Sequence, residues 1–261
     1  MRVRAALLVF ALLYAPATAA HADAGESEGP GPRQTFRVAA SAGMGVTLRA
    51  VDLPSDGAIL QLRSGLYPAF EVGFALLHET TDSVTTRLGV RYQSSLLRQP
   101  VIELHVDGSE RALGLRSHRL ELELAPSLRL DQAGRWALSP SLAYALLNLR
   151  PEVHHLLTPS YSLGGPLLRL SLSVALIAER LLLHIGPEVQ YLLQVGDGLR
   201  EHGVDTSGLA LGAEAGLELQ LSATLSLRMG YRQKHALIGS SEGRHFRDVS
   251  HFGTLSLVGK P

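Results

Sequence analysis

The sequence predicts an all-β protein: a transmembrane, up-and-down antiparallel β-barrel of about ten strands. Long stretches of the 261-residue chain alternate apolar and polar residues, as strands do when their side chains point to opposite faces. At membrane depth, the apolar face of these stretches carries no Asp, Glu, Lys or Arg, whereas the other face carries many. The connections between the stretches alternate between short and long.

Composition excludes several kinds of site. The chain has no cysteine, which rules out disulfides, thiolate metal sites and cysteine nucleophiles. Its formal net charge is +0, so no overall field favours nucleic acid or acidic partners. No Gly-rich phosphate loop and no basic, aromatic-rich stripe is present, and we expect no nucleic-acid partner.

The first residues have the three parts of a secretory signal. Arg2 and Arg4 precede an apolar run from Ala5 to Ala15, and small residues follow up to Ala22. We expect a signal peptide over 1–22 that is cleaved after Ala22, with Ala19 as the alternative, followed by a flexible periplasmic leader over 23–35. No later apolar run is long enough for a spanning helix, so membrane insertion would be by strands.

The ten strands are placed from this alternation. The clearest hairpin covers 168–194, where two alternating runs meet at a turn over 178–180. The other stretches show the same period of two. We expect strands at 36–48, 66–78, 84–97, 118–130, 135–148, 168–177, 181–194, 208–221, 225–237 and 249–258.

Two long connections need separate interpretation. Residues 49–65, which include Pro54 and Gly57, are expected to form a loop. Residues 98–117 are centred on Asp107-Gly108, a strong hairpin signal, and we expect the third and fourth strands to continue there beyond the membrane. The alternative is an extra spanning pair, which would make twelve strands; eight is the other even count left open.

The distribution of charge predicts which face meets lipid. A Lys or Arg facing lipid at mid-depth costs about 2–4 kcal/mol, so the uncharged face should be outside. A soluble ligand-binding barrel would have the opposite arrangement. The polar face is then expected to line the lumen with a network of paired charges, formed by Arg37, Glu71, Arg87, Arg91, Arg119, Glu121, Glu123, Arg169, Glu188, Glu214, Glu218, Arg228 and Arg232.

By this pattern, residues 36–258 resemble the small outer-membrane β-barrel proteins of Gram-negative bacteria. The resemblance implies a barrel domain over 36–261, short periplasmic turns and long outer loops. It also implies outer-membrane localisation, contact with outer-membrane lipid and with the barrel-assembly machinery, and a monomer.

Three functions are compatible with such a barrel. We expect a charged, largely plugged lumen and a structural or surface-interaction role, in which the long outer loops meet an extracellular ligand. The first alternative is a narrow passive channel for small polar solutes. The second is an outer-membrane hydrolase, either a protease or an enzyme that modifies lipid A.

Enzymatic and metal sites have few candidates. Resemblance to outer-membrane proteases implies paired aspartates with a His–Asp couple near the outer rim, where this chain offers His202 with Asp205 and the pair His154–His155. A lipid A deacylase would need a His and a Ser in contact near the lipid face, but Ser250 and His251 should point to opposite faces. The histidines expected in outer loops, His154, His155, His202 and His245, have no diagnostic metal spacing. We therefore expect no catalytic residues, no cofactor and no metal.

Overall fold

The computed structural model describes residues 35–55, 58–81, 83–96, 99–104, 110–151, 159–177, 180–240, 243 and 245–259. The expected signal peptide, the leader up to residue 34, and the pair His154–His155 lie outside these residues.

Almost all of the described chain is in strands, as the period-two pattern predicts. The strands are β1 (Thr35–Ser55), β2 (Ala58–Ser64), β3 (Tyr67–Thr81), β4 (Val84–Ser95), β5 (Gln99–Leu104), β6 (Glu110–Arg129), β7 (Trp136–Pro151), β8 (Tyr161–Ile177), β9 (Leu181–Leu192), β10 (Gln194–Val195), β11 (Val204–Gln220), β12 (Leu225–Ser240) and β13 (Phe246–Gly259). A short helix, α2 (Asp197–Arg200), follows β10. Among the described residues, no helix is long and apolar enough to cross a membrane.

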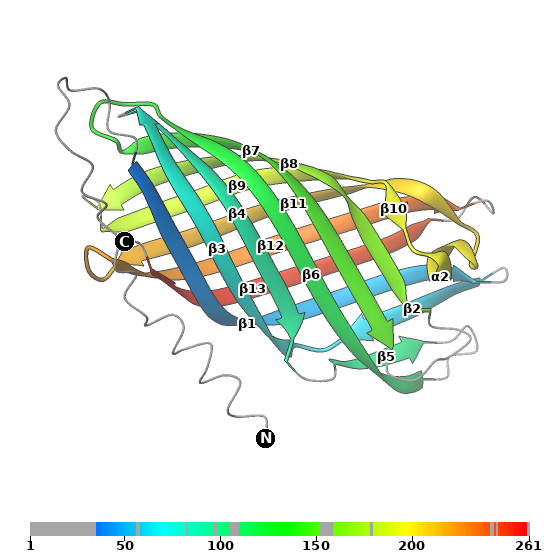
Figure 1. Ribbon diagram of the computed structural model, residues 1–261. Coiled ribbons are helices and arrows are strands. Elements are labelled where there is room, and N and C mark those ends of the chain that lie inside the picture. Colours follow the sequence, from blue (N-terminus) through cyan, green and yellow to red (C-terminus); the bar gives the residue numbers. More distant parts are fainter. Residues whose placement is uncertain are drawn as a thin grey trace, which may run out of the picture. The chain divides into compact units, whose positions relative to one another are not determined.

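Ten of these strands close into an antiparallel barrel (Figure 1). Each strand pairs with the next in the order β1, β3, β4, β6, β7, β8, β9, β11, β12, β13, and β13 pairs back with β1. The closing register runs from Ala40↔Gly259 to Asp52↔Arg247. The expected fold class and strand count are confirmed, and the alternatives of eight and twelve strands are wrong.

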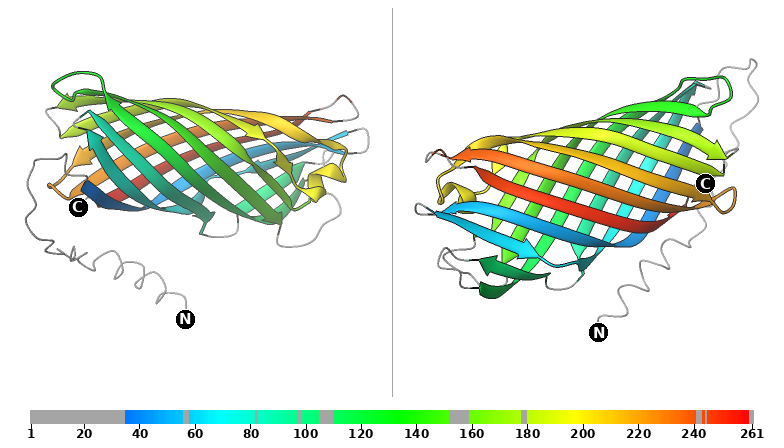
Figure 2. Two further views of the ribbon diagram at one scale, coloured as in Figure 1. Left: turned by 45° about the horizontal axis from the view of Figure 1, so that its top comes forward. Right: turned by 180° about the vertical axis from the view of Figure 1, so that it is seen from behind.

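The two ends of the barrel differ. The connections β3–β4, β6–β7, β8–β9 and β11–β12 are all short and lie at one end, which we call the short-turn end. Figure 1 shows β2, β5, β10 and α2 gathered at the opposite end, which we call the long-loop end, and Figure 2 shows the same grouping from two other sides.

At the long-loop end, two of the ten strands are interrupted and then continue. β2 precedes β3 with only Gly65 and Leu66 between them, and β5 follows β4 after residues 96–98. β2 pairs with both β1 and β5, and β5 pairs with β6, so the same ring is extended. The expected continuation is confirmed over 99–104 and 110–117, whereas Asp107-Gly108 lies outside the described residues. The expected loop over 49–65 is wrong, because β1 runs to Ser55 and β2 starts at Ala58.

The barrel surface is apolar over its middle. Large apolar side chains on the outward face are exposed on every one of the ten strands, among them Phe36, Phe74, Leu122 and Leu168. An apolar surface of this extent would be strongly unfavourable in water, whereas in contact with acyl chains it has no such cost. The outward face is therefore the side expected to meet lipid.

Near the long-loop end the pattern inverts, and apolar side chains face inward. On β1, for example, Val51 and Leu53 are buried inside, whereas Asp52 between them is not. These inward residues pack into one cluster, which we call the apolar cap. It consists of Val51, Leu53, Leu60, Leu62, Leu115, Leu149, Tyr161, Leu163, Leu192, Val195, Leu199, Val204, Ala210, Ala236, Ile238 and Phe246.

Candidate functional site

The lumen is the candidate functional site, and Arg169 lies at its centre. Arg169 faces inward from β8, opposite Glu188 on β9. Its Nη2 donates to Glu121 Oε1 at 2.9 Å and to Glu188 Oε2 at 2.8 Å, and its Nη1 donates to Glu123 Oε1 at 2.8 Å. One buried guanidinium thus holds three carboxylates from two sides of the barrel.

Further arginines complete this charged layer. Arg119 Nη2 lies 3.0 Å from Glu121 Oε2. Arg232 Nη2 lies 3.2 Å from Glu214 Oε2, and Arg91 Nη1 lies 3.7 Å from the same oxygen. We call the seven residues Arg91, Arg119, Glu121, Arg169, Glu188, Glu214 and Arg232 the charged layer. Because opposite charges alternate across it, the layer pairs ions whose burial would otherwise be costly.

Above the charged layer, towards the long-loop end, a second polar group lies under the apolar cap. Arg49 donates to both carboxylate oxygens of Asp248, at 2.8 Å and 2.6 Å. The Tyr161 hydroxyl donates to Asp248 Oδ2 at 3.1 Å. Tyr161 lies beyond the apolar outer band of β8, and its burial, followed by the charge of Asp248, raises the pKa of its hydroxyl well above the ordinary value. The phenol therefore stays protonated and remains a donor to Asp248.

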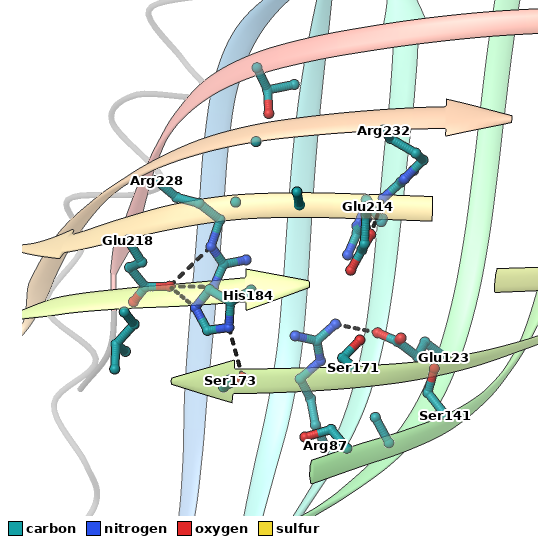
Figure 3. Close-up of a pocket in the computed structure, with 18 of the residues that line it drawn as sticks. Arg87, Glu123, Ser141, Ser171, Ser173, His184, Glu214, Glu218, Arg228 and Arg232 are labelled. Carbon is teal, nitrogen blue, oxygen red and sulfur yellow. Dashed lines mark hydrogen bonds and ion pairs between the residues drawn. The ribbon is translucent and has the colours of Figure 1, made fainter. Parts of the chain in front are cut away.

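Below the charged layer, towards the short-turn end, lies a cavity of about 350 Å³. Arg87 pairs with Glu123 on one side of it, and Arg228 Nε donates to Glu218 Oε2 at 3.0 Å on the other. Figure 3 shows these two pairs pointing into the cavity from opposite walls. Serines from three neighbouring strands line the wall between them: Ser127, Ser139, Ser141, Ser171 and Ser173.

Exposure shows from which end solvent reaches the lumen. The side chains of Arg87, Arg228 and His184 are 35%, 34% and 28% exposed, whereas that of Arg169 is 1% exposed. The apolar cap beyond the charged layer is buried. Among the described residues of the lumen, the side chains around the cavity on the short-turn side are therefore more accessible to solvent than Arg169 in the charged layer.

A serine, a histidine and a carboxylate follow one another along the cavity wall. Ser173 on β8 is directly opposite His184 on β9, and Ser173 Oγ lies 2.8 Å from His184 Nδ1. His184 Nε2 lies 3.7 Å from Glu218 Oε2, the oxygen that Arg228 also holds. Figure 3 shows the four side chains as one chain of contacts across β8, β9, β11 and β12.

The structure brings most of the charges expected in the lumen together. Besides the charged layer, Arg87, Glu123, Glu218 and Arg228 pair around the cavity, and Glu71 lines it. Arg37 lies apart, half-exposed and 3.6 Å from Glu79 near the short-turn end.

Three further charged residues lie in the lumen outside the predicted network: Arg49, Asp248 and Lys234. Arg49 and Asp248 each lie one residue beyond an expected strand. Lys234 has the inward phase of its strand and contacts the side-chain oxygen of Gln190. Of the three residues, only Lys234 could have been assigned to the lumen from the sequence, because it is at an inward position of a predicted strand.

Those rim residues that the structure describes form no matching protease or metal site. Within the described ranges, no hydrogen bond or ion pair joins His202 to Asp205, and no group of three or more His, Asp or Glu side chains is arranged to hold a metal ion. Ser250 lines a lumen cavity, whereas His251 contacts the hydroxyl of Tyr231, which is on the outward face.

A serine and a histidine do meet elsewhere near the long-loop end. Ser94 Oγ lies 2.9 Å from His118 Nδ1, but the hydroxyl of Tyr92 lies 2.8 Å from the same nitrogen. Ser94 is also buried. A buried hydroxyl that competes with a phenol for one ring nitrogen is a poor nucleophile, so this contact fits a structural role.

Comparisons with known proteins relate the chain to barrels of one kind. No protein-family model matches it, and no curated protein matches it significantly. Among solved structures, the outer membrane protease OmpT from Escherichia coli aligns with a TM-score of 0.55 at 9% identity, covering 87% of this chain and 98% of that one.

Two further structures align less well. An outer membrane channel from Pseudomonas putida gives a TM-score of 0.43 at 12% identity, covering 90% of this chain and 100% of that one. The outer membrane protein OprG from Pseudomonas aeruginosa gives 0.42 at 9% identity, covering 87% and 97%. At these identities the likeness concerns fold and not activity. The chain therefore has the fold of the Gram-negative outer-membrane β-barrels.

Proposed function

We propose that this protein is a non-conducting outer-membrane barrel, whose role is structural or surface-interactive and whose long-loop end faces the cell exterior. The observation that supports the proposal is that two buried groups of side chains lie in the lumen at successive depths, first the charged layer and then the apolar cap.

The charged layer alone is a strong barrier. The side chains of Arg169, Glu121 and Glu188 are almost fully buried and are held to one another by several charge-assisted hydrogen bonds. Opening a path would leave some of these ions unpaired in a poorly hydrated place, which costs several kcal/mol per ion. A passive pore lined with charges needs hydrated side chains instead.

The apolar cap is a second and chemically different barrier. It contains sixteen buried residues, contributed by the strand extensions and by α2. No polar path through these residues is available to an ion, and water does not enter apolar packing of this kind. The long-loop end therefore presents a closed surface, suited to contact with ligands or partners outside the cell.

Conductance in planar bilayers tests the closure. We expect no unitary current from the wild-type protein, with insertion verified by vesicle flotation. Arg169→Gly with Glu121→Gly should thin the charged layer, and Leu149→Gly with Phe246→Gly should thin the cap. We expect neither pair of substitutions alone to conduct, and their combination to conduct. Steady unitary currents from the wild type would refute the proposal in favour of a narrow channel.

Orientation is tested on intact cells. A short epitope tag inserted between Asp107 and Gly108, in the β5–β6 connection, should be recognised by antibody without permeabilisation. The same tag inserted between Ser222 and Ala223, in the short β11–β12 turn, should be recognised only after permeabilisation. The reverse result would show that the long-loop end does not face the exterior.

A further inference from the structure

The contact between Ser173 and His184 has the geometry of an activated nucleophile. Their 2.8 Å separation is a normal hydrogen-bond distance, and both side chains line the cavity that opens at the short-turn end. A serine hydroxyl becomes a nucleophile when an adjacent base accepts its proton. His184 Nδ1 accepts that proton if the other ring nitrogen, Nε2, carries the hydrogen.

Glu218 favours the tautomer that this reaction needs. Its Oε2 is the carboxylate oxygen nearest to His184 Nε2, at 3.7 Å. This distance is too long for a hydrogen bond, but the negative charge of the carboxylate favours a ring with the hydrogen on Nε2 and stabilises the imidazolium that forms when Nδ1 takes a proton. Arg228 holds the same oxygen at 3.0 Å and keeps the carboxylate in place.

The cavity provides space and donors for a substrate. Its volume of about 350 Å³ lies at the lower end of the range of roughly 300–1,000 Å³ typical of small-molecule sites. The side chain of Arg87 is 35% exposed at this cavity, so its guanidinium provides a positive charge for a substrate oxygen. The limited volume and the charged side chains of Arg87 and Glu123 in the lining favour a short, polar substrate over a long acyl chain.

We propose that Ser173, His184 and Glu218 form an esterase site that cleaves short-chain carboxylic esters entering the lumen from the short-turn end. Ser173 Oγ attacks the ester carbonyl carbon while its proton passes to His184 Nδ1. The C–O bond to the leaving alkoxide then breaks, and His184 returns the proton to that oxygen, releasing an alcohol and leaving an acyl-serine. Water, activated by the same nitrogen, hydrolyses this acyl-serine to release the carboxylic acid and regenerate the hydroxyl.

This proposal departs from the expectation that the chain is not an enzyme, and it is independent of whether the barrel conducts. If Ser173 had only a structural role, its hydroxyl would react like any other hydroxyl of the lumen wall. The neighbouring Ser171 provides the comparison, because it lines the same cavity on the same strand face two residues away. Among the described residues, no histidine forms a hydrogen bond with the Ser171 hydroxyl, whereas His184 contacts that of Ser173.

The test uses the mature barrel in detergent micelles, with folding verified by its shifted mobility in unheated gels. A fluorophosphonate probe should label the wild-type protein at one site, identified by peptide mass spectrometry as Ser173. Ser173→Ala should abolish labelling, and His184→Gln and Glu218→Gln should slow it by at least tenfold. Ser171→Ala should label at the wild-type rate. Hydrolysis of p-nitrophenyl acetate should follow the same order across the variants.

The outcomes separate the two readings. Labelling that depends on Ser173 and His184 but not on Ser171 supports the esterase site. A folded wild-type protein that takes up no probe overturns the proposal, as does labelling that persists in Ser173→Ala or falls equally in Ser171→Ala. Slow ester hydrolysis that is unchanged in every variant would be background and would overturn it too.

Discussion

Replacing Arg169 by alanine should destabilise the barrel more than any other single charge removal in the lumen. The side chain is 1% exposed, and its guanidinium lies 2.8–2.9 Å from three carboxylates, on Glu121, Glu123 and Glu188. Removing it leaves these carboxylates buried with reduced compensation. Breaking a buried ion pair in this way costs about 3–5 kcal/mol. A loss of about 3 kcal/mol corresponds to more than a hundredfold in the folding equilibrium constant.

Urea unfolding in lipid vesicles measures this loss. The chain has a single tryptophan, Trp136, which lies on the outward face and reports whether the barrel is in lipid. Arg37→Ala is the matched control, because Arg37 is 50% exposed and lies 3.6 Å from Glu79, a pair worth about 0–1 kcal/mol. If Arg169→Ala lost no more stability than Arg37→Ala, the claim that the charged layer is a buried, interdependent network would be refuted.

Three further substitutions, two of them with a matched control, test other parts of the fold by the same unfolding measurement. Phe246→Ala should lower the free energy of unfolding by about 3–5 kcal/mol, because the ring is 0% exposed in the apolar cap. Its control is Phe36→Ala, where the ring is 62% exposed on the lipid face and the loss should be less than half as large. Met44→Arg should cost about 2–4 kcal/mol if that face meets lipid, and little if it meets water. Gly45→Ala should cost about 1–3 kcal/mol, because its Cβ would lie 2.1 Å from the carbonyl oxygen of Gly253 across the closing seam. Gly253→Ala should be tolerated, since its Cβ would meet nothing nearer than Val46 Cγ2 at 3.9 Å; equal losses at the two glycines would contradict the register of β1 and β13.

The spanning part of the fold could be predicted because lipid imposes a simple rule on each strand. Outward positions such as Met44 and Leu168 must be apolar, and inward positions such as Arg169 are free to be charged. This rule acts on each strand separately. The alternation, the strand count and the inward direction of the charges therefore follow without knowledge of strand pairing.

The loop wrongly expected over 49–65 shows where this rule stops applying. Beyond the membrane the outside meets water and the inside is packed, so the apolar phase moves from even positions such as Leu48 to odd ones such as Val51 and Leu53. The same inversion occurs on β12, where Tyr231 is outward and Ile238 is inward. If the apolar residues are expected to keep the same alternation along a whole strand, the strand is expected to end where the alternation inverts. The rest of the strand is then taken for a loop. The inversion itself was the signal for the apolar cap.

The contacts of the candidate site depend on register, which the sequence does not specify. Arg169 meets Glu121 and Glu123 across 48 and 46 residues, so these pairs need the closed barrel to be known first. The contact between Ser173 and His184 is easier to predict, because both residues are at inward positions of the same hairpin. Whether they are opposite depends on the pairing around the turn at 178–180, which shifts register between Ala175 and Ile177. One residue of slip would have moved the serine away from the histidine.

The two proposed closures determine from which side a substrate would reach the proposed esterase site, although the chemistry of that site does not depend on them. A nucleophile in a continuous pore would be exposed to solutes from both sides, whereas with the proposed closures by the charged layer and the apolar cap only the short-turn end would be open. With the orientation proposed above, the substrate and both products would be exchanged with the periplasm. Because the chain has no cysteine, this sidedness is directly measurable: a cysteine placed at Ser171 should react with a membrane-impermeant maleimide only from the short-turn side of a sealed vesicle. Reaction from the long-loop side would mean that the cap does not close the lumen, and the proposed site would then face the cell exterior as well.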